Sequence, residues 1–437
     1  MLKAISPIDG RYATKTKSLQ DYFSEAALIK YRIHVELAYY NHLCKMKIVD
    51  AEGVDIDAFL STLDMSSYER VKSIEKITNH DVKAVEYFLK ESLVDTIDDK
   101  HSEFIHFGLT SQDINNTAMP MMIRDAINEV IIPELVDCQK LLSDMSTDYK
   151  EIPLLAHTHG QPASPTSLGK EMKVFEYRLG LQIEKLKKFE HSAKFGGATG
   201  NFNAHKTSYP SRDWPNEINE MISSLGLKRQ SYTTQIDNYD GLAEVFQILI
   251  RINTIYIDFA RDIWTYISMN YFKQKVVANE VGSSAMPHKV NPIDFENAEG
   301  NLGLANALLG YLSEKLPVSR LQRDLTDSTV TRNIGVPFGH IMVALKSLQK
   351  GIGKLEVNEE KIKQDLLDNW AVVAEAIQTV LKREGFEKPY ELLKAFSRGK
   401  GKLSKEDFDQ FIDDLDASDE LKSELRAITP YNYIGYA

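Results

Sequence analysis

The sequence predicts an all-α protein built of long helices. Between Gly241 and Gly282 there is neither glycine nor proline, and apolar side chains recur there at close to 3.5-residue spacing. A second apolar stripe over 168–189 repeats at three- and four-residue steps, and residues 1–110 show no strand-rich run. Stripes of this length would leave too much apolar surface bare in a monomer, so we expect a helix bundle that continues across subunit interfaces.

The pattern changes twice along the chain and predicts three helical domains. Residues 1–110 alternate short helical patterns with turns, residues 111–356 carry the long stripes, and residues 357–437 are strongly charged. We expect an N-terminal helical domain, a central long-helix bundle and a small helical C-terminal domain. Further helices are predicted over 127–149, 295–312 and 336–348, and amphipathic segments over 366–381, 389–396 and 406–415.

Composition narrows the class of protein. A hydrophobic content of 43% and a charged content of 26% are ordinary for a soluble globular protein. The formal charge of -11 argues against a broad nucleic-acid surface, and no uninterrupted apolar stretch is long enough to span a bilayer. Two cysteines far apart indicate a reducing compartment, and the first residues lack a signal-peptide pattern. We therefore expect a cytoplasmic protein without membrane or nucleic-acid partners.

The segment 282–297 has the composition of an anion-binding loop. A glycine lets the backbone turn and two prolines stiffen the residues after it, so that Ser283, Lys289 and Asn291 can converge on one small ligand. An ordinary polar turn between two helices is the alternative. The spacing of the fixed residues favours the anion site.

Two further polar segments precede predicted helices. Thr78 or Asn79 could cap a helix, which would let His80 face a cavity. Thr110 and Ser111 offer two hydroxyls beside the free N–H groups of a helix start, which attract carboxylates. A simple capping role for these hydroxyls is equally compatible with the sequence.

Three other sets of residues allow a chemical and a structural interpretation. His157 and His159 could bind a metal, but no strand and helix alternation of a hydrolase barrel surrounds them, so we expect no metal. The segment 319–332 holds three arginines and is either a solvated charge run or a phosphate cradle. The turn that contains Arg11 and Tyr12 is either a surface turn or a second phosphate contact.

The loop sequence resembles the signature of the fumarase/aspartase superfamily, Gly-Ser-Ser-x-Met-Pro-x-Lys-x-Asn-Pro, and matches every fixed position. His288, the run His-Thr-His-Gly-Gln-Pro-Ala over 157–163 and the run Ser-Pro-Ile-Asp-Gly-Arg-Tyr over 6–12 resemble the branch that acts on succinylated purine nucleotides. The resemblance implies three all-helical domains and a homotetramer without cofactor, in which each active site takes loops from three subunits.

The resemblance also implies the chemistry: β-elimination of fumarate from adenylosuccinate, which gives AMP, and from SAICAR, which gives AICAR. It assigns Ser283 as the general base, with Lys289 beside it to lower its proton affinity. His159 becomes the general acid that protonates the leaving nitrogen, and Glu296 orients it. His80 completes the implied catalytic set.

The substrate-binding residues implied by the resemblance fall into four groups. The residues that hold the fumaryl carboxylates are Thr110, Ser111, Ser284 and Asn291, with a contribution from Lys289. The residues that hold the nucleotide phosphate and its ribose are Arg11, Tyr12, Arg323, Ser328 and Arg332. The substrate pocket is lined by Asn79, His80 and Asp81, and the substrate is also contacted by Gln235 and Asn297.

Three other functions compete with this one. Fumarase or argininosuccinate lyase activity would leave the arginine sets unexplained, because neither substrate carries a phosphate. A metal-dependent hydrolase would use His157 and His159. A non-enzymatic helical protein is disfavoured by the joint presence of four residues: Ser283, His159, Lys289 and Glu296.

Overall fold

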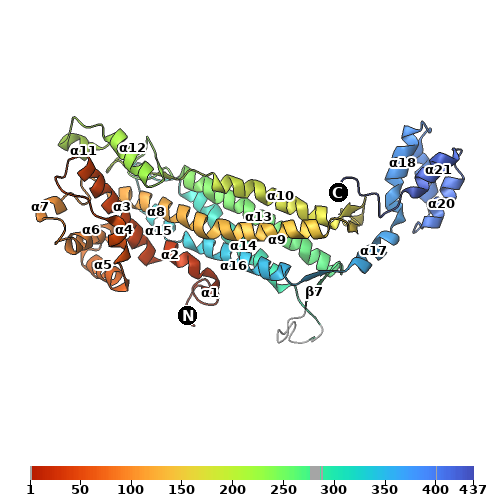
Figure 1. Cartoon of the computed structure of the whole chain (residues 1–437), viewed down its shortest axis with the longest axis horizontal. Coiled ribbons are helices and arrows are strands. Elements are labelled where there is room, and N and C mark those ends of the chain that lie inside the picture. Colours follow the sequence, from red (N-terminus) through yellow and green to blue (C-terminus); the bar gives the residue numbers. More distant parts are fainter. Residues whose placement is uncertain (1, 276–285, 287–288, 400) are drawn as a thin grey trace. The chain divides into compact units, whose positions relative to one another are not determined.

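The computed structural model describes residues 2–275, 286, 289–399 and 401–437. Helices dominate these residues, and their strands are pieces of two or three residues (Figure 1). The predicted all-α fold is therefore confirmed.

The N-terminal part consists of one long and several short helices. The long helix, α3, begins where the Ser24 hydroxyl accepts the N–H of Ala27 at 3.1 Å, and it spans Glu25–Lys45. The others are α1 (Ala13–Thr16), η1 (Lys17–Leu19), α2 (Gln20–Phe23), α4 (Ile56–Ser61), α5 (Met65–Thr78), α6 (Asp81–Ser92) and α7 (Asp99–Ser102).

The sequence prediction of the boundary between α5 and α6 was wrong. Thr78 is the last residue of α5, and Asn79 follows it in the left-handed conformation with φ 51°. The N-cap of α6 is His80, whose ring nitrogen accepts the N–H of Lys83. Asparagine tolerates the left-handed region, so it ends one helix here and leaves the cap of the next to the histidine.

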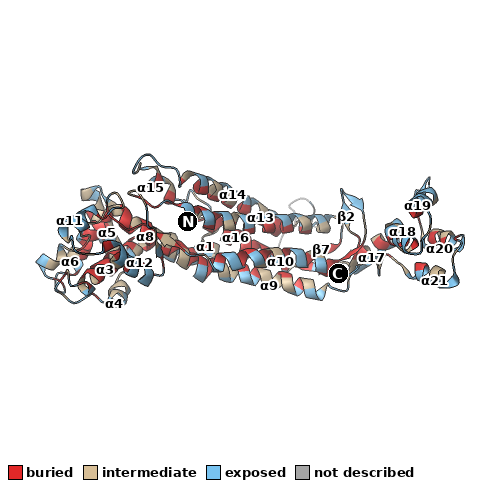
Figure 2. Ribbon diagram, turned by 90° about the horizontal axis from the view of Figure 1, so that it is seen from above, coloured by how far each residue is buried: buried red, intermediate tan, exposed pale blue. Residues whose placement is uncertain are grey.

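The long helices confirm the predicted apolar stripes. The middle of the chain contains α8 (Ser111–Ala126), the π-helical turn η2 (Ile127–Ile131), α9 (Ile132–Asp148), α10 (Leu168–Lys187), α11 (Asn203–Ser208), α12 (Trp214–Ser224), α13 (Asp240–Ser268), α14 (Ile293–Lys315), α15 (Thr326–Thr331) and α16 (Gly335–Ile352). The helices α9, α10, α13 and α14 each bury one face and expose another, whereas α8 has no exposed residue and α16 exposes only Lys350 (Figure 2).

Pro120 lies inside α8, where proline normally breaks a helix. Its missing N–H leaves the carbonyl of Asn116, one turn earlier, without its helical donor. The backbone N–H of Lys194 donates to this carbonyl at 3.3 Å. A neighbouring segment thus replaces the lost helical hydrogen bond, and α8 continues into η2 and α9.

The C-terminal part contains short amphipathic helices around a small core of its own. One of the predicted segments, 366–381, is interrupted: α17 (Glu359–Leu367) ends where Asn369 donates to the carbonyl of Asp365 at 2.7 Å. Trp370 is buried at the break. The remaining elements are η3 (Trp370–Val373), α18 (Ala374–Arg383), α19 (Pro389–Ser397), α20 (Lys405–Asp413) and α21 (Asp419–Ala427).

The short strands form four two-stranded pairs in the described residues. Three pairs are antiparallel: β1 (Pro153–Leu154) with β4 (Thr166–Ser167), β2 (His157–Thr158) with β3 (Gln161–Pro162), and β7 (Phe272–Gln274) with β8 (Leu355–Val357). The fourth, β5 (Ser192–Ala193) with β6 (Lys228–Arg229), is parallel.

The chain divides into two compact units, each drawn from three stretches. Unit 1 comprises Met1–Val136, Gln182–Thr254 and Gly300–Lys346, and unit 2 comprises Asp137–Leu181, Ile255–Glu299 and Ser347–Ala437. The three-domain division stays a prediction. None of the helices in the described residues combines the length and the apolar character that crossing a bilayer requires.

Unit 1 contains a large hydrophobic core formed by α3, α5, α6, α8 and α12. Ile33, Tyr39, Val85, Ile114 and Ile218 are fully or almost fully buried there. This core fixes the starts of α6 and α8, beside which the predicted site residues Asn79, His80, Asp81, Thr110 and Ser111 lie.

Candidate active site

The predicted site residues fall into three sets. Ser283 and Ser284 lie outside the described residues. Unit 2 holds His159, Lys289, Asn291, Glu296 and Asn297, and unit 1 holds Arg11, Tyr12, Asn79, His80, Asp81, Thr110, Ser111, Gln235, Arg323, Ser328 and Arg332.

In unit 1 the structure brings His80 and Ser111 together. The Nδ1 atom of His80 accepts the N–H of Lys83 at 3.1 Å, and Nε2 lies 3.3 Å from Oγ of Ser111. The first contact caps α6 and holds the ring. The second leaves a polar edge of the ring beside the start of α8.

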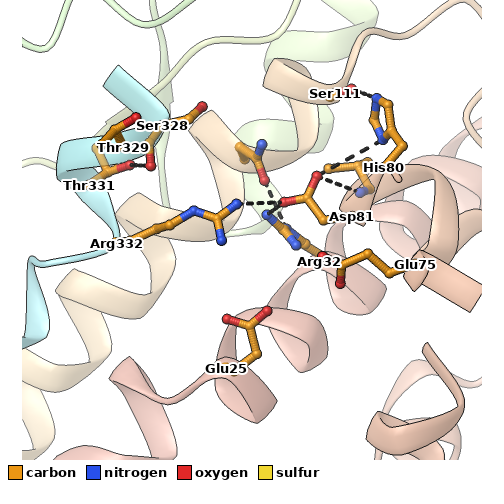
Figure 3. A network of polar contacts seen from close by, with 12 residues as sticks. Glu25, Arg32, Glu75, His80, Asp81, Ser111, Ser328, Thr329, Thr331 and Arg332 are labelled. Atoms are coloured by element: carbon orange, nitrogen blue, oxygen red, sulfur yellow. Dashed lines mark hydrogen bonds and ion pairs between the residues drawn. The ribbon is translucent and has the colours of Figure 1, made fainter. Parts of the chain in front are cut away.

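Asp81, the next residue, lies between two arginines (Figure 3). Its Oδ2 atom accepts a hydrogen bond from Nη2 of Arg32 at 2.7 Å and lies 3.5 Å from Nη2 of Arg332, while Oδ1 accepts the N–H of Val82 at 2.9 Å. Burial would raise the pKa of Asp81, but the charge and hydrogen bond of Arg32, the N–H of Val82 and the charge of Arg332 together lower the pKa below its ordinary value. Asp81 is therefore a carboxylate in the folded protein.

Arg323 connects three other groups. Its Nη2 atom donates to Oγ of Ser328 at 2.8 Å, its Nη1 donates to Oε1 of Gln235 at 3.4 Å, and its Nε lies 3.5 Å from Oδ1 of Asp327. Asp327 is buried and also accepts the Tyr239 hydroxyl at 3.1 Å. Three predicted site residues from two segments thus meet at one guanidinium.

A cavity in unit 1 is lined by members of both arginine networks. Its wall includes Asp81, Arg332, Ser328 and Asp327, and the predicted residues Arg11 and Tyr12 are not among the described residues that line it. The other lining residues are Phe23, Ser24, Glu25, Leu28, Arg32, Gln112, Asn115, Asn116, Met119, Met122, Tyr239, Thr331, Ile334 and Gly335. The cavity combines charged groups with apolar walls, as small-molecule sites do.

Arg11 and Tyr12 precede α1. The guanidinium carbon of Arg11 lies 5.9 Å from the centre of the Tyr12 ring, and the Arg11 side chain is exposed. The two residues therefore offer a cation and a phenol at the surface of unit 1.

A buried ion pair supports the start of α8. Asp113 and Lys194 are fully buried, with 2.6 Å between Oδ1 and Nζ. The same carboxylate accepts the N–H groups of Thr110, Gly196 and Gly197 at 2.8, 2.8 and 3.1 Å. The glycine-rich loop that begins at Gly196 therefore binds the carboxylate of Asp113. The same carboxylate also holds the backbone of Thr110.

In unit 2, His159 lies at the exposed tip of the hairpin formed by β2 and β3. Thr158 pairs with Gln161, so the loop consists of His159 and Gly160, with φ values of 54° and 71°. Two positive φ values are typical of the type I′ turn, for which Asn-Gly is a preferred sequence. The hairpin presents the His159 imidazole to solvent.

Glu296 lies in the first turn of α14, and Asn297 follows it. Glu296 is exposed and accepts the indole N–H of Trp264 at 3.1 Å, and Asn297 accepts the Ser347 hydroxyl at 2.9 Å. No hydrogen bond or ion pair joins His159 to Glu296 among the described residues of unit 2. Lys289 is exposed and Asn291 is half-buried just before α14.

The comparisons with known proteins agree along the whole chain. Residues 10–306 match a family described as lyase, and residues 319–434 match a family described as adenylosuccinate lyase C-terminal. An adenylosuccinate lyase of Dictyostelium discoideum is 54% identical over 451 residues, covering 99% of this chain and 97% of that protein. This chain belongs to the adenylosuccinate lyase family. The adenylosuccinate lyase of Escherichia coli (strain K12) is 50% identical over 448 residues, which cover 100% of this chain and 97% of that protein.

Two solved structures share the fold. A 3-carboxy-cis,cis-muconate lactonizing enzyme from Pseudomonas putida has a TM-score of 0.76 at 21% identity, over 96% of this chain and 94% of that one. A fumarate lyase from Mesorhizobium sp. BNC1 has a TM-score of 0.76 at 17% identity, over 96% and 95%. The all-helical architecture of this adenylosuccinate lyase family member is thus shared with more distant enzymes.

Sequence reasoning missed the residues behind the predicted ones. Arg32, Asp113 and Asp327 each contact a predicted site residue, and Lys194 and Tyr239 in turn contact Asp113 and Asp327. A charged residue inside an apolar helical stripe is a local signal for Arg32, and the capping-box spacing from Thr110 to Asp113 is a local signal for Asp113.

Proposed function

We propose that this chain cleaves adenylosuccinate into fumarate and AMP, and SAICAR into fumarate and AICAR, by β-elimination. The observation that carries the proposal is the match to adenylosuccinate lyases at 50–54% identity over almost the full length of both partners. The second substrate is included because both substrates present the same succinyl group and the same 5′-phosphate.

The elimination needs one base and one acid on opposite sides of the bond that breaks. Ser283, as the alkoxide, takes the proton from the carbon next to a succinyl carboxylate, and the resulting carbanion expels the nitrogen. His159, in its protonated form, then protonates that nitrogen. Lys289 stabilises the alkoxide of Ser283, and Glu296 supports the charge of His159.

The hairpin geometry supports the acid assignment. Asparagine would suit the first position of the His159-Gly160 turn better than histidine, which indicates that the imidazole is there for its chemistry. Its exposure at a hairpin tip allows it to reach a substrate bound by residues of another subunit. Each site then contains loops from different copies of the chain.

The start of α8 supports the carboxylate-binding role of Thr110 and Ser111, since free N–H groups and the helix dipole favour an anion there. Asn291, Ser284, Asn297 and Lys289 complete this part of the proposed site.

The arginine networks of unit 1 support phosphate binding. Arg323 and Arg332 both have carboxylate partners 3.5 Å away, and such long ion pairs are open to exchange for a phosphate. Ser328, Arg11 and Tyr12 add donors, and Asn79, His80, Asp81 and Gln235 face the rest of the nucleotide.

We also propose a cytoplasmic homotetramer that needs no metal or cofactor, because side chains supply both proton transfers. Several large apolar side chains of the long helices are exposed and indicate contacts with other copies. They are Val174, Tyr177 and Leu181 on α10, Trp264 on α13, and Leu304 and Tyr311 on α14. Light scattering should give a mass of four chains, and a monomeric mass at working concentration would contradict the assembly.

The activity is tested by the loss of adenylosuccinate absorbance with fumarate identified as product, before and after treatment with a chelator. SAICAR is tested in parallel, and argininosuccinate and malate serve as control substrates. Turnover of a control substrate instead of adenylosuccinate would contradict the proposal. Mixing Ser283→Ala chains with His159→Ala chains should restore part of the activity, because a shared site with both native residues then forms.

A further inference from the structure

Two positively charged arginine side chains lie beside the single negative charge of Asp81. Arg32 donates to Oδ2 at 2.7 Å, and Arg332 lies 3.5 Å from the same oxygen. Figure 3 shows both guanidinium groups next to the carboxylate of Asp81. The two arginines differ sharply in exposure, with 5% of the Arg32 side chain and 56% of the Arg332 side chain accessible.

Arg32 is held in place by a second contact. Its Nε atom donates to Oδ1 of Asn115 on α8 at 2.8 Å while its Nη2 donates to Asp81 at the start of α6. A planar guanidinium that bridges two fixed acceptors has little freedom to move. Arg32 therefore joins α3, α6 and α8 around the carboxylate of Asp81.

Arg332 is held less firmly than Arg32. Of the described residues, Asp81 is the only carboxylate that forms an ion pair with it. The contact is long and exposed, whereas the contact of Arg32 is short and buried. Because Arg32 already neutralises the charge of Asp81, Arg332 is available to bind another anion.

We propose that Arg32 is a positioning residue that neutralises Asp81 and so keeps Arg332 available for the phosphate of the substrate. This inference rests on the proposed function, in which Arg332 binds that phosphate. Without Arg32, Asp81 would keep Arg332 as its arginine partner and would compete with the phosphate for it. Arg32 then controls nucleotide affinity without touching the nucleotide.

The test compares two ligands that differ only in the phosphate. In Arg32→Gln, AMP should bind roughly tenfold more weakly or worse, and adenosine should bind as it does to the unmodified chain. The control variant is Arg70→Gln, which removes the exposed ion pair between Arg70 and Glu91 in the same unit. It should leave AMP binding unchanged. Equal weakening of AMP and adenosine, or no weakening of either, would overturn the inference.

A second substitution separates charge competition from loss of structure. Adding Asp81→Asn to Arg32→Gln removes the competing carboxylate, so the preference for AMP over adenosine should recover relative to Arg32→Gln alone. No recovery would contradict the proposal. If Arg32→Gln does not fold, Arg32→Lys retains the positive charge and should bind AMP within about threefold of the unmodified chain. A selective tenfold loss in that variant would also overturn it.

Failure of this inference can be distinguished from failure of the proposed function. An unmodified chain that releases no fumarate from adenylosuccinate contradicts the proposed function. An active chain whose Arg32→Gln variant keeps its full preference for AMP over adenosine contradicts this inference alone.

Discussion

The Nε2 atom of His80 lies 3.3 Å from the Oγ atom of Ser111, across the starts of α6 and α8. Because Nδ1 accepts the N–H of Lys83, the neutral ring carries its hydrogen on Nε2 and donates it toward Ser111. One nitrogen of His80 therefore caps a helix and the other faces the candidate site. The two roles can be separated by substitution.

His80→Asn should keep the cap and lose the function. Asparagine is among the best N-cap residues, so the free energy of unfolding should stay within about 0.5 kcal/mol of the unmodified chain. Fumarate release should fall by roughly 10²-fold or more, because the Nε2 donor is gone. Urea denaturation and the absorbance assay measure the two effects.

His80→Ala provides the comparison, since it removes both contacts and should cost about 1 kcal/mol more in stability. Near-normal turnover of the asparagine variant would limit His80 to its capping role.

His159→Asn should have little effect on the fold and a large effect on the reaction. Asparagine is at home in the first position of a type I′ turn, so the hairpin of β2 and β3 should form at least as well. Turnover should fall by roughly 10²–10⁴-fold if the imidazole is the general acid. The exposed neighbour His157 gives a matched control, and His157→Gln should retain most of the activity. Equal losses at the two positions would contradict the assignment of the acid.

Lys194→Met should strongly destabilise unit 1. It would leave the fully buried carboxylate of Asp113 without its cation, which typically costs about 3–5 kcal/mol. Lys170→Met removes a lysine that is half-exposed beside Glu171 and should cost less than about 1 kcal/mol. Chemical denaturation of both variants gives the comparison, and similar small losses would mean that Asp113 is satisfied by backbone N–H groups alone.

Stability should decrease in mild acid because of His205. Burial lowers the pKa of its imidazole to about 4, whereas the unfolded chain has the ordinary value of 6.5. Between these values the unfolded state binds more protons than the folded state, so stability falls as the pH is lowered from about 6.5 to about 4. The difference corresponds to about 3 kcal/mol at most.

Denaturation curves at several pH values should therefore show a shallower pH dependence for His205→Gln than for the unmodified chain. The exposed His157→Gln should keep the original slope, which makes it the control. Identical slopes for all three proteins would assign the acid sensitivity to other groups.

The fold was predictable where one face of a helix is apolar over many turns. The stripe that includes Val245 and Phe259 lies in α13 as expected, because burial along such a stripe determines the structure of a long segment. The break at Asn369 was not predictable, since it depends on a side chain that donates to a carbonyl at the end of α17 and on the burial of Trp370 in a core formed by distant residues.

The sequence predicted the segments that carry the candidate site residues. It did not predict the buried residues that hold those site residues in place. The family resemblance predicts Asp81 and Arg332 as site residues, and the structure places them 3.5 Å apart. Arg32 lies 49 positions before Asp81, and Lys194 lies 81 positions after Asp113. Pairs this far apart in sequence carry no local pattern, so only the packing of α3, α6 and α8 reveals them.

Pro120 reverses a common rule of protein engineering. Replacing a proline inside a helix with alanine usually strengthens it, because the helix regains a donor. In α8 the regained N–H of residue 120 would donate to the carbonyl of Asn116, but this carbonyl already accepts the N–H of Lys194. The substitution would set two amides in competition for one acceptor, and the segment beside the site would loosen as the helix became more regular.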